Sequence, residues 1–94
     1  MGREMTELEM KLDSVIEAAW KADRNEVMTL RCPCGGGLTI KFSALKTKNA
    51  LVVECNACPA SQHVLSYREP PPWAKPIRAH EFRVVKTESG GSAS

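Results

Sequence analysis

Apolar residues in the first third of the chain recur every three or four positions. They are Leu8, Leu12, Val15, Ile16, Ala19 and Trp20. This spacing places them on one stripe of a helix, with charged residues on the opposite face. Thr6 and Glu9 have the spacing of a capping box at the helix start. The pattern predicts an amphipathic helix from about Glu7 to Arg24, with Asn25 as its terminator.

The apolar stripe of this helix has two interpretations. It packs on the rest of the chain as core, or it binds a partner. Several of its positions follow a heptad seam, which would pair with the same helix of a second copy. The candidate partner-binding residues are Leu8, Leu12, Val15, Ala19, Trp20 and Trp73. A protein partner and a homodimer are therefore both expected possibilities for this helix.

The middle of the chain has strand character. Apolar and polar residues alternate from Leu38 to Phe42, and Leu51 to Val53 is a second run of residues that favour strands. The polar, basic stretch from Ser43 to Asn49 fits the tip of a hairpin between them. Val27 to Arg31 and His63 to Tyr67 are two further candidate strands.

The last part of the chain begins with prolines. Pro70 to Trp73 must be extended, Ile77 to Lys86 is a candidate strand, and the Gly/Ser-rich stretch from Thr87 to Ser94 is expected to be disordered. The segments are a helix (1–26), a domain around the cysteines (27–69), an extended segment with a possible strand (70–86) and a tail (87–94). The fold class is a small α+β domain with three or four antiparallel strands after an N-terminal helix.

Four cysteines supply the candidate chemistry. Cys32 and Cys34 form one close pair, and Cys55 and Cys58 form another. Two tight turns brought together by a hairpin supply the four tetrahedral ligands that structural zinc requires. The alternatives are disulfides, a Cys-x-x-Cys redox motif, and His63 as a substitute ligand. Four cysteines would close the shell around one structural Zn²⁺, which excludes metal catalysis at this site.

With its ligand turns separated by two strands, the segment from about Val27 to Tyr67 resembles the zinc-ribbon family, a class of zinc finger. The resemblance implies an antiparallel sheet stapled by zinc and says little about function. One departure is the first turn, which is Cys-x-Cys where ribbons usually carry Cys-x-x-Cys. Lysines at the hairpin tip also replace the acidic pair of transcript-cleavage ribbons, so that activity is not implied.

Charge is unevenly distributed along the 94 residues. Residues 1–26 hold four basic and seven acidic residues, residues 27–70 five and two, and residues 71–94 four and two. Since the net charge is only +2 and zinc thiolates would lower it, strong nonspecific nucleic-acid binding is not favoured. A local basic patch remains an alternative, and its candidate phosphate contacts are Arg31, Lys41, Lys46, Lys48 and Arg68.

Composition narrows the function classes further. Aromatic residues are 5% of the chain, which disfavours a large pocket for a small-molecule substrate. No stretch of about 20 apolar residues is present, so the expectation is a cytoplasmic protein without membrane contact. The sequence favours a non-enzymatic interaction module built on structural zinc, with a nucleic-acid-associated ribbon as the alternative.

Overall fold

The structure is a computed structural model of the 94-residue chain. It describes the backbone of residues 7–78 and 80–87 and the side chains from residue 12 onward. The predicted capping box at Thr6 and Glu9, the side chain of Leu8 and the stretch 88–94 of the predicted tail lie outside the described residues. Among the described helices, none is long and apolar enough to cross a membrane.

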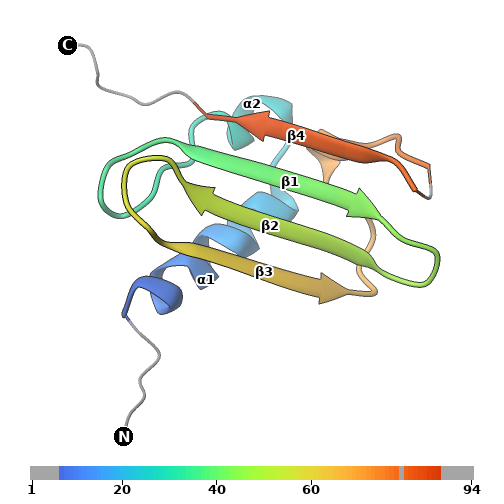
Figure 1. Ribbon diagram of the computed structural model, residues 1–94. Coiled ribbons are helices and arrows are strands. Elements are labelled where there is room, and N and C mark those ends of the chain that lie inside the picture. Colours follow the sequence, from blue (N-terminus) through green and yellow to red (C-terminus); the bar gives the residue numbers. More distant parts are fainter. Residues whose placement is uncertain (1–6, 79, 88–94) are drawn as a thin grey trace, which may run out of the picture.

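The chain forms a small α+β fold, as the sequence predicted, with the helices on one side of a four-stranded antiparallel sheet (Figure 1). The spatial order of the strands is β3-β2-β1-β4. The elements are α1 (Glu7–Lys21), α2 (Arg24–Val27), β1 (Leu38–Ala44), β2 (Asn49–Cys55), β3 (Ser61–Ser66), the 3-10 helix η1 (Pro72–Ala74) and β4 (Phe82–Lys86).

Strand β1 lies in the middle of the sheet and pairs with both β2 and β4. The β1–β2 hairpin confirms the two predicted strands and extends each of them toward the turn. Its register pairs Leu38 with Cys55 at one end and Ala44 with Asn49 at the other. The residues just before β1 and just after β2 therefore meet at one end of the sheet, which we call the cysteine end. The opposite end, with the β1–β2 turn, is the hairpin end.

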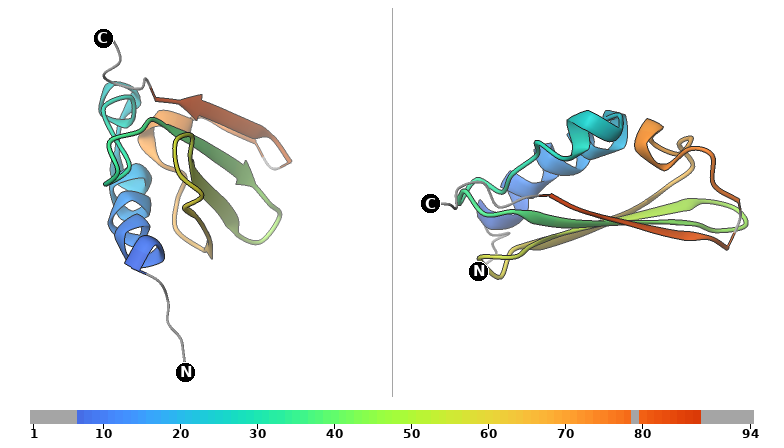
Figure 2. Two further views of the ribbon diagram at one scale, coloured as in Figure 1. Left: turned by 60° about the vertical axis from the view of Figure 1, so that its left-hand side comes forward. Right: turned by 90° about the horizontal axis from the view of Figure 1, so that it is seen from above.

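Helix α1 packs across one face of the sheet, mainly over β2 and β3 (Figure 2). Along β1 every second residue is buried against this helical layer, as alternation predicts: Leu38, Ile40, Phe42 and Ala44. The apolar stripe of α1 meets these residues, because Leu12, Val15, Ile16, Ala19 and Trp20 are all buried. The structure thus places the described part of the stripe in the core.

Phe42 occupies the centre of this core and is fully buried. The rings of Trp20 and Trp73 contact it edge-on, each with its centroid 6.2 Å away. The indole N–H of Trp73 donates to the carbonyl of Ala19 at 2.8 Å, and that of Trp20 donates to the carbonyl of Glu69 at 2.8 Å. The segment from Pro70 to Trp73, predicted to be extended, is so only at its start: Pro72–Ala74 forms η1, because proline is tolerated in the first turn of a helix. This segment connects β3 to β4 and carries Trp73 into the core.

Several predicted elements differ in the structure. The stretch Val27 to Arg31 is not a strand: Asp23 and Glu26 form a reciprocal capping box, which starts the short helix α2 after α1 has ended at Lys21. Asn25 is inside α2 and terminates nothing. The last strand begins only at Phe82, five residues later than predicted.

Thr87 corrects the predicted start of the disordered tail. Its side chain is buried, its hydroxyl accepts from the amide of Leu38 at 2.6 Å, and its own amide donates to the carbonyl of Leu38 at 2.8 Å. The ladder between β1 and β4 therefore continues through Thr87.

Candidate metal centre

The two cysteine pairs come together at the cysteine end of the sheet. Cys32 and Cys34 lie in the loop between α2 and β1, while Cys55 ends β2 and Cys58 lies in the β2–β3 turn. The four sulfur atoms are all within 4.8 Å of one another. Among the described residues this cluster contains the four cysteines alone, and His63 lies elsewhere, exposed on β3. The structure thus brings together the same four cysteines that the sequence predicted to meet.

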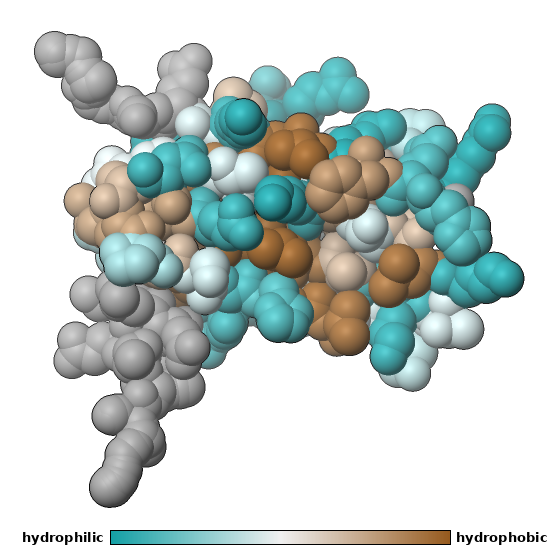
Figure 3. Space-filling model, viewed as in Figure 1, coloured by the Kyte–Doolittle hydropathy of each residue, from teal (hydrophilic) through white to brown (hydrophobic). Residues whose placement is uncertain are grey.

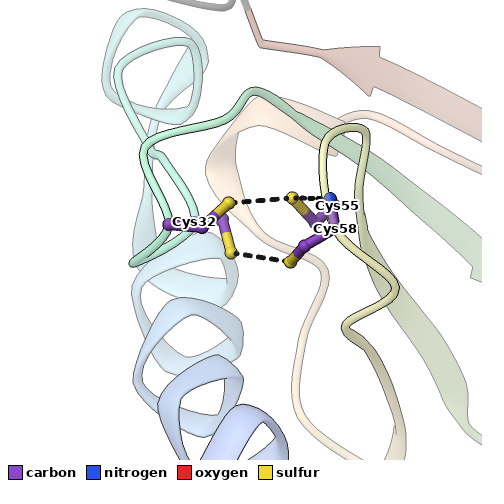
Figure 4. A group of neighbouring side chains, drawn as sticks. Cys32, Cys55 and Cys58 are labelled. Atoms are coloured by element: carbon purple, nitrogen blue, oxygen red, sulfur yellow. Dashed lines mark hydrogen bonds between the residues drawn. The ribbon is translucent and has the colours of Figure 1, made fainter.

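The shape of the cluster suits a tetrahedral ion. Sγ of Cys34 lies 3.5 Å from Sγ of Cys55, and Sγ of Cys32 lies 3.7 Å from Sγ of Cys58. Zinc–sulfur bonds of about 2.3 Å put the edges of a tetrahedron at about 3.8 Å. In Figure 4 the side chains of the two loops point toward one another across the space between them. All four are free cysteines, so the structure contains neither of the disulfides considered above.

Each loop is shaped by backbone hydrogen bonds. In the first, the amide of Gly35 donates to the carbonyl of Cys32 at 2.7 Å, and the amide of Cys32 donates to the carbonyl of Gly36 at 3.1 Å. Gly35 has φ +96°, a conformation that glycine adopts without a steric penalty. The Cys-x-Cys spacing therefore closes as a tight turn that presents both thiols to the second loop.

Gly36 lets the two loops approach each other closely. A Cβ atom at this position would lie only 2.5 Å from Cβ of Ala57 in the second loop, well inside van der Waals contact. A hydrogen bond from the amide of Asn56 to the carbonyl of Gly37, at 3.0 Å, joins the loops beside this contact. Gly36 is therefore a positioning residue. The glycines after Cys34 are expected in a turn around a metal, but the close approach to Ala57 could not be predicted, because it depends on the pairing of distant loops.

The second loop directs amides at one sulfur. The amides of Ala57 and Cys58 donate to Sγ of Cys55 at 3.2 Å and 3.3 Å. Burial would raise the pKa of this thiol, but these two amides, together with hydrogen bonds from the thiols of Cys58 and Cys34, outweigh it and lower the pKa of Cys55 to about 7. At Cys32, burial prevails and raises the pKa to about 12. The second loop stabilises a thiolate, whereas the buried thiol of Cys32 would ionise readily only with a cation beside it.

The five candidate phosphate-binding residues do not form one patch. Arg31, near the cysteine end, donates to the carbonyls of Met28 and Leu30, both at 2.9 Å. Arg68 forms two hydrogen bonds of 3.0 Å with the carboxylate of Glu17 on α1 and lies over the ring of Trp20. Both guanidinium groups therefore already form hydrogen bonds within the protein.

The three lysines of that set are placed differently. Lys41 lies on β1, on the face of the sheet away from the helices, 3.6 Å from the carboxylate of Glu54. Lys46 and Lys48 lie in the β1–β2 turn at the hairpin end. Of the candidate partner-binding residues, the five with described side chains are buried, so none of them is available at the surface.

Comparisons of the chain with protein-family models, with curated proteins and with solved structures found no match. The geometry of the cysteine cluster and the surfaces of the described residues are therefore the features that indicate function.

Proposed function

We propose that the protein binds one zinc ion through Cys32, Cys34, Cys55 and Cys58, and that the ion is structural, as in a zinc ribbon. The observation that carries this proposal is the convergence of four free thiols within 4.8 Å, from two loops on either side of one hairpin. Four sulfur donors in a tetrahedral arrangement suit zinc or iron among the common metals. Zinc is the usual occupant of structural sites with four cysteines.

A structural role follows from the closed shell. Four thiolates fill the coordination sphere of zinc, which leaves no position for water or substrate to bind the metal. The ion would instead link the loop after α2 to the β2–β3 turn, and so hold the helical layer to the sheet. Binding of this kind contributes on the order of 10 kcal/mol of apparent free energy to folding. The protein is then a non-enzymatic interaction module.

The partner surface of this module is not the helix stripe. The side chains of Leu12, Val15, Ala19 and Trp20 are buried beneath α1, and exposing them would cost much of the core. The face of the sheet opposite the helices is uncovered by any described element, which supports placing partner contacts there.

Metal analysis combined with native mass spectrometry tests the proposal. Protein produced with both zinc and iron in the medium is expected to carry one zinc ion, to lose it to a chelator, and to lose cooperative thermal unfolding with it. Cys58→Ser should behave like the chelated protein. His63→Ala is the control, since His63 is outside the cluster, and it should retain its zinc.

Three results would contradict the proposal. A metal-free protein with an unchanged melting curve would overturn the structural site. One bound iron with visible thiolate-to-metal absorption would replace zinc as the occupant. Loss of zinc in His63→Ala would show that the ligand set is wrong.

A further inference from the structure

One face of the sheet has no described element packed against it. The helices and η1 all lie on the other side (Figure 2). Directly paired residues of neighbouring antiparallel strands point to the same face, so the strand register defines the open face. Its three rows are Leu65, Ala50, Ser43 and Phe82; His63, Val52, Lys41 and Val84; and Ser61, Glu54, Thr39 and Lys86.

Exposed apolar side chains on the open face lie mainly toward the hairpin end. Phe82 is 60% exposed, Leu65 53% and Val84 43%. Figure 3 shows apolar groups gathered over the strands on this side, with polar groups between them. The central strand contributes the polar floor, since its residues here are Thr39, Lys41 and Ser43. Apolar side chains on β4 and on β2 and β3 thus flank a strand that carries hydroxyls and a positive charge.

Charge on the open face is mainly positive. Lys41 and Lys86 lie within its rows, and Glu54 is the one carboxylate among them. Lys46 and Lys48 extend the positive charge into the β1–β2 turn, beside the row that contains Phe82.

The acidic residues of the described helical layer are engaged elsewhere. Glu17 pairs with Arg68, Asp13 accepts a hydrogen bond from Gln62, and Asp23 and Glu26 cap α2. The molecule therefore presents a positive face at the sheet and keeps most described acids on the helical side.

We propose that the open face binds single-stranded nucleic acid. Lysines attract the phosphates, and an exposed aromatic ring provides a stacking surface that accepts any base. A sugar-phosphate backbone lying along β1 would contact Lys41 and Ser43. The bases of that nucleic acid would then lie against Phe82 on one side and Leu65 on the other. No described element protrudes from the open face to enter the groove of a duplex, which favours the single strand.

This inference gives the proposed interaction module a surface and a partner class, and it rests on that interaction role. It does not rest on the metal, because the apolar part of the open face lies toward the hairpin end while the cysteines lie at the other end. Failure of one proposal is therefore distinguishable from failure of the other.

Fluorescence anisotropy with labelled oligo-dT and oligo-U of about 12 nucleotides tests the inference on the full chain. We expect both to bind at low salt. Phe82→Ala should weaken binding at least about fivefold through lost stacking. Met28→Ala is the matched control, since Met28 is also an exposed apolar side chain but follows α2 on the helical side; it should leave binding unchanged.

Charge variants test the phosphate contacts. Lys41→Gln should reduce the slope of log affinity against log salt by about 0.7, the value for one lost phosphate contact on a single strand. Lys21→Gln, on α1, should leave that slope unchanged. Glu54→Gln removes the carboxylate of the face and frees Lys41, so it should strengthen binding, a result that no loss of folding imitates.

Metal content and melting curves measured on the same samples distinguish failure of nucleic-acid binding from failure of metal binding or folding. Absence of binding by protein that holds its metal overturns the inference and leaves the metal proposal intact. Equal losses in Lys21→Gln and Lys41→Gln would show diffuse attraction, which also overturns it. A dimer in solution that Phe82→Ala converts to monomer, without oligonucleotide binding, would assign the face to a second copy instead.

Discussion

Val52 and Val53 are neighbours on β2 and lie on opposite faces of the sheet. Val53 is fully buried beneath the helical layer, whereas Val52 is only half-buried, on the open face. The same contrast holds for Phe42, buried between two tryptophans, and Phe82, which is 60% exposed. The two members of each pair are the same type of residue, so residue type does not explain why one is buried and the other is exposed. Apolar side chains on the face that α1 covers are part of the core. Equally apolar side chains on the open face are available to a partner.

The largest expected effect comes from a phenylalanine on the covered face. Phe42→Ala should lower the free energy of unfolding by about 3–5 kcal/mol, because it leaves a cavity where two indole rings converge. Phe82→Ala, the same change on the open face, should cost no more than about 0.5 kcal/mol. Urea denaturation of the metal-loaded protein measures both. Similar values for the two variants would mean that the faces do not differ as described.

A smaller effect is expected from introducing a hydroxyl at adjacent positions. Val53→Thr buries a polar group where the aliphatic side chain packed, and it should cost about 1–3 kcal/mol. Val52→Thr exposes its hydroxyl and should change stability by less than about 0.5 kcal/mol. Thermal and urea unfolding report the difference. Because the two residues share one strand, a loss at Val52 equal to that at Val53 would show that the open face is covered in solution.

The cysteine end provides a change that leaves both faces intact. Gly36→Ala places a methyl group against Cβ of Ala57 and should weaken metal binding about 10- to 100-fold by forcing the loops apart. Competition with a chromogenic chelator measures this affinity. The double variant Gly36→Ala with Ala57→Gly removes the opposing methyl and should recover most of the loss. Without such recovery, the close approach of the loops is not what limits the affinity.

The smallest effect is expected at an exposed ion pair on the helical side. Both side chains of the Arg68–Glu17 pair are about half exposed, so solvent screens their attraction. Glu17→Gln should cost less than about 0.5 kcal/mol in urea unfolding, and that cost should shrink further at high salt. A loss as large as that of Val53→Thr would show that polar contacts, and not apolar packing alone, hold the helix on the sheet.

Local sequence patterns were sufficient for some elements. The alternation in β1 and the run of valines in β2 predicted a hairpin, and the Cys-rich turns on either side predicted the cluster that the hairpin brings together. The missed features depend on partners distant in the sequence. Thr87 continues the ladder through its bonds to Leu38, and Arg68 forms an ion pair with Glu17. The capping box of α2 was readable from Asp23 and Glu26, but strand-favouring residues after it masked the signal.

By itself, the sequence determined that β1 has one apolar and one polar face, that α1 carries an apolar stripe, and that four thiols would meet at one end of a hairpin, because periodicity and short loops are local properties of the chain. Only the tertiary structure decided which surfaces cover one another. It placed α1 over the sheet, brought Trp73 back between α1 and Phe42, and set β4 beside β1. These choices fixed the open face, because a sheet face is exposed or buried according to what packs on it and not according to its own residues.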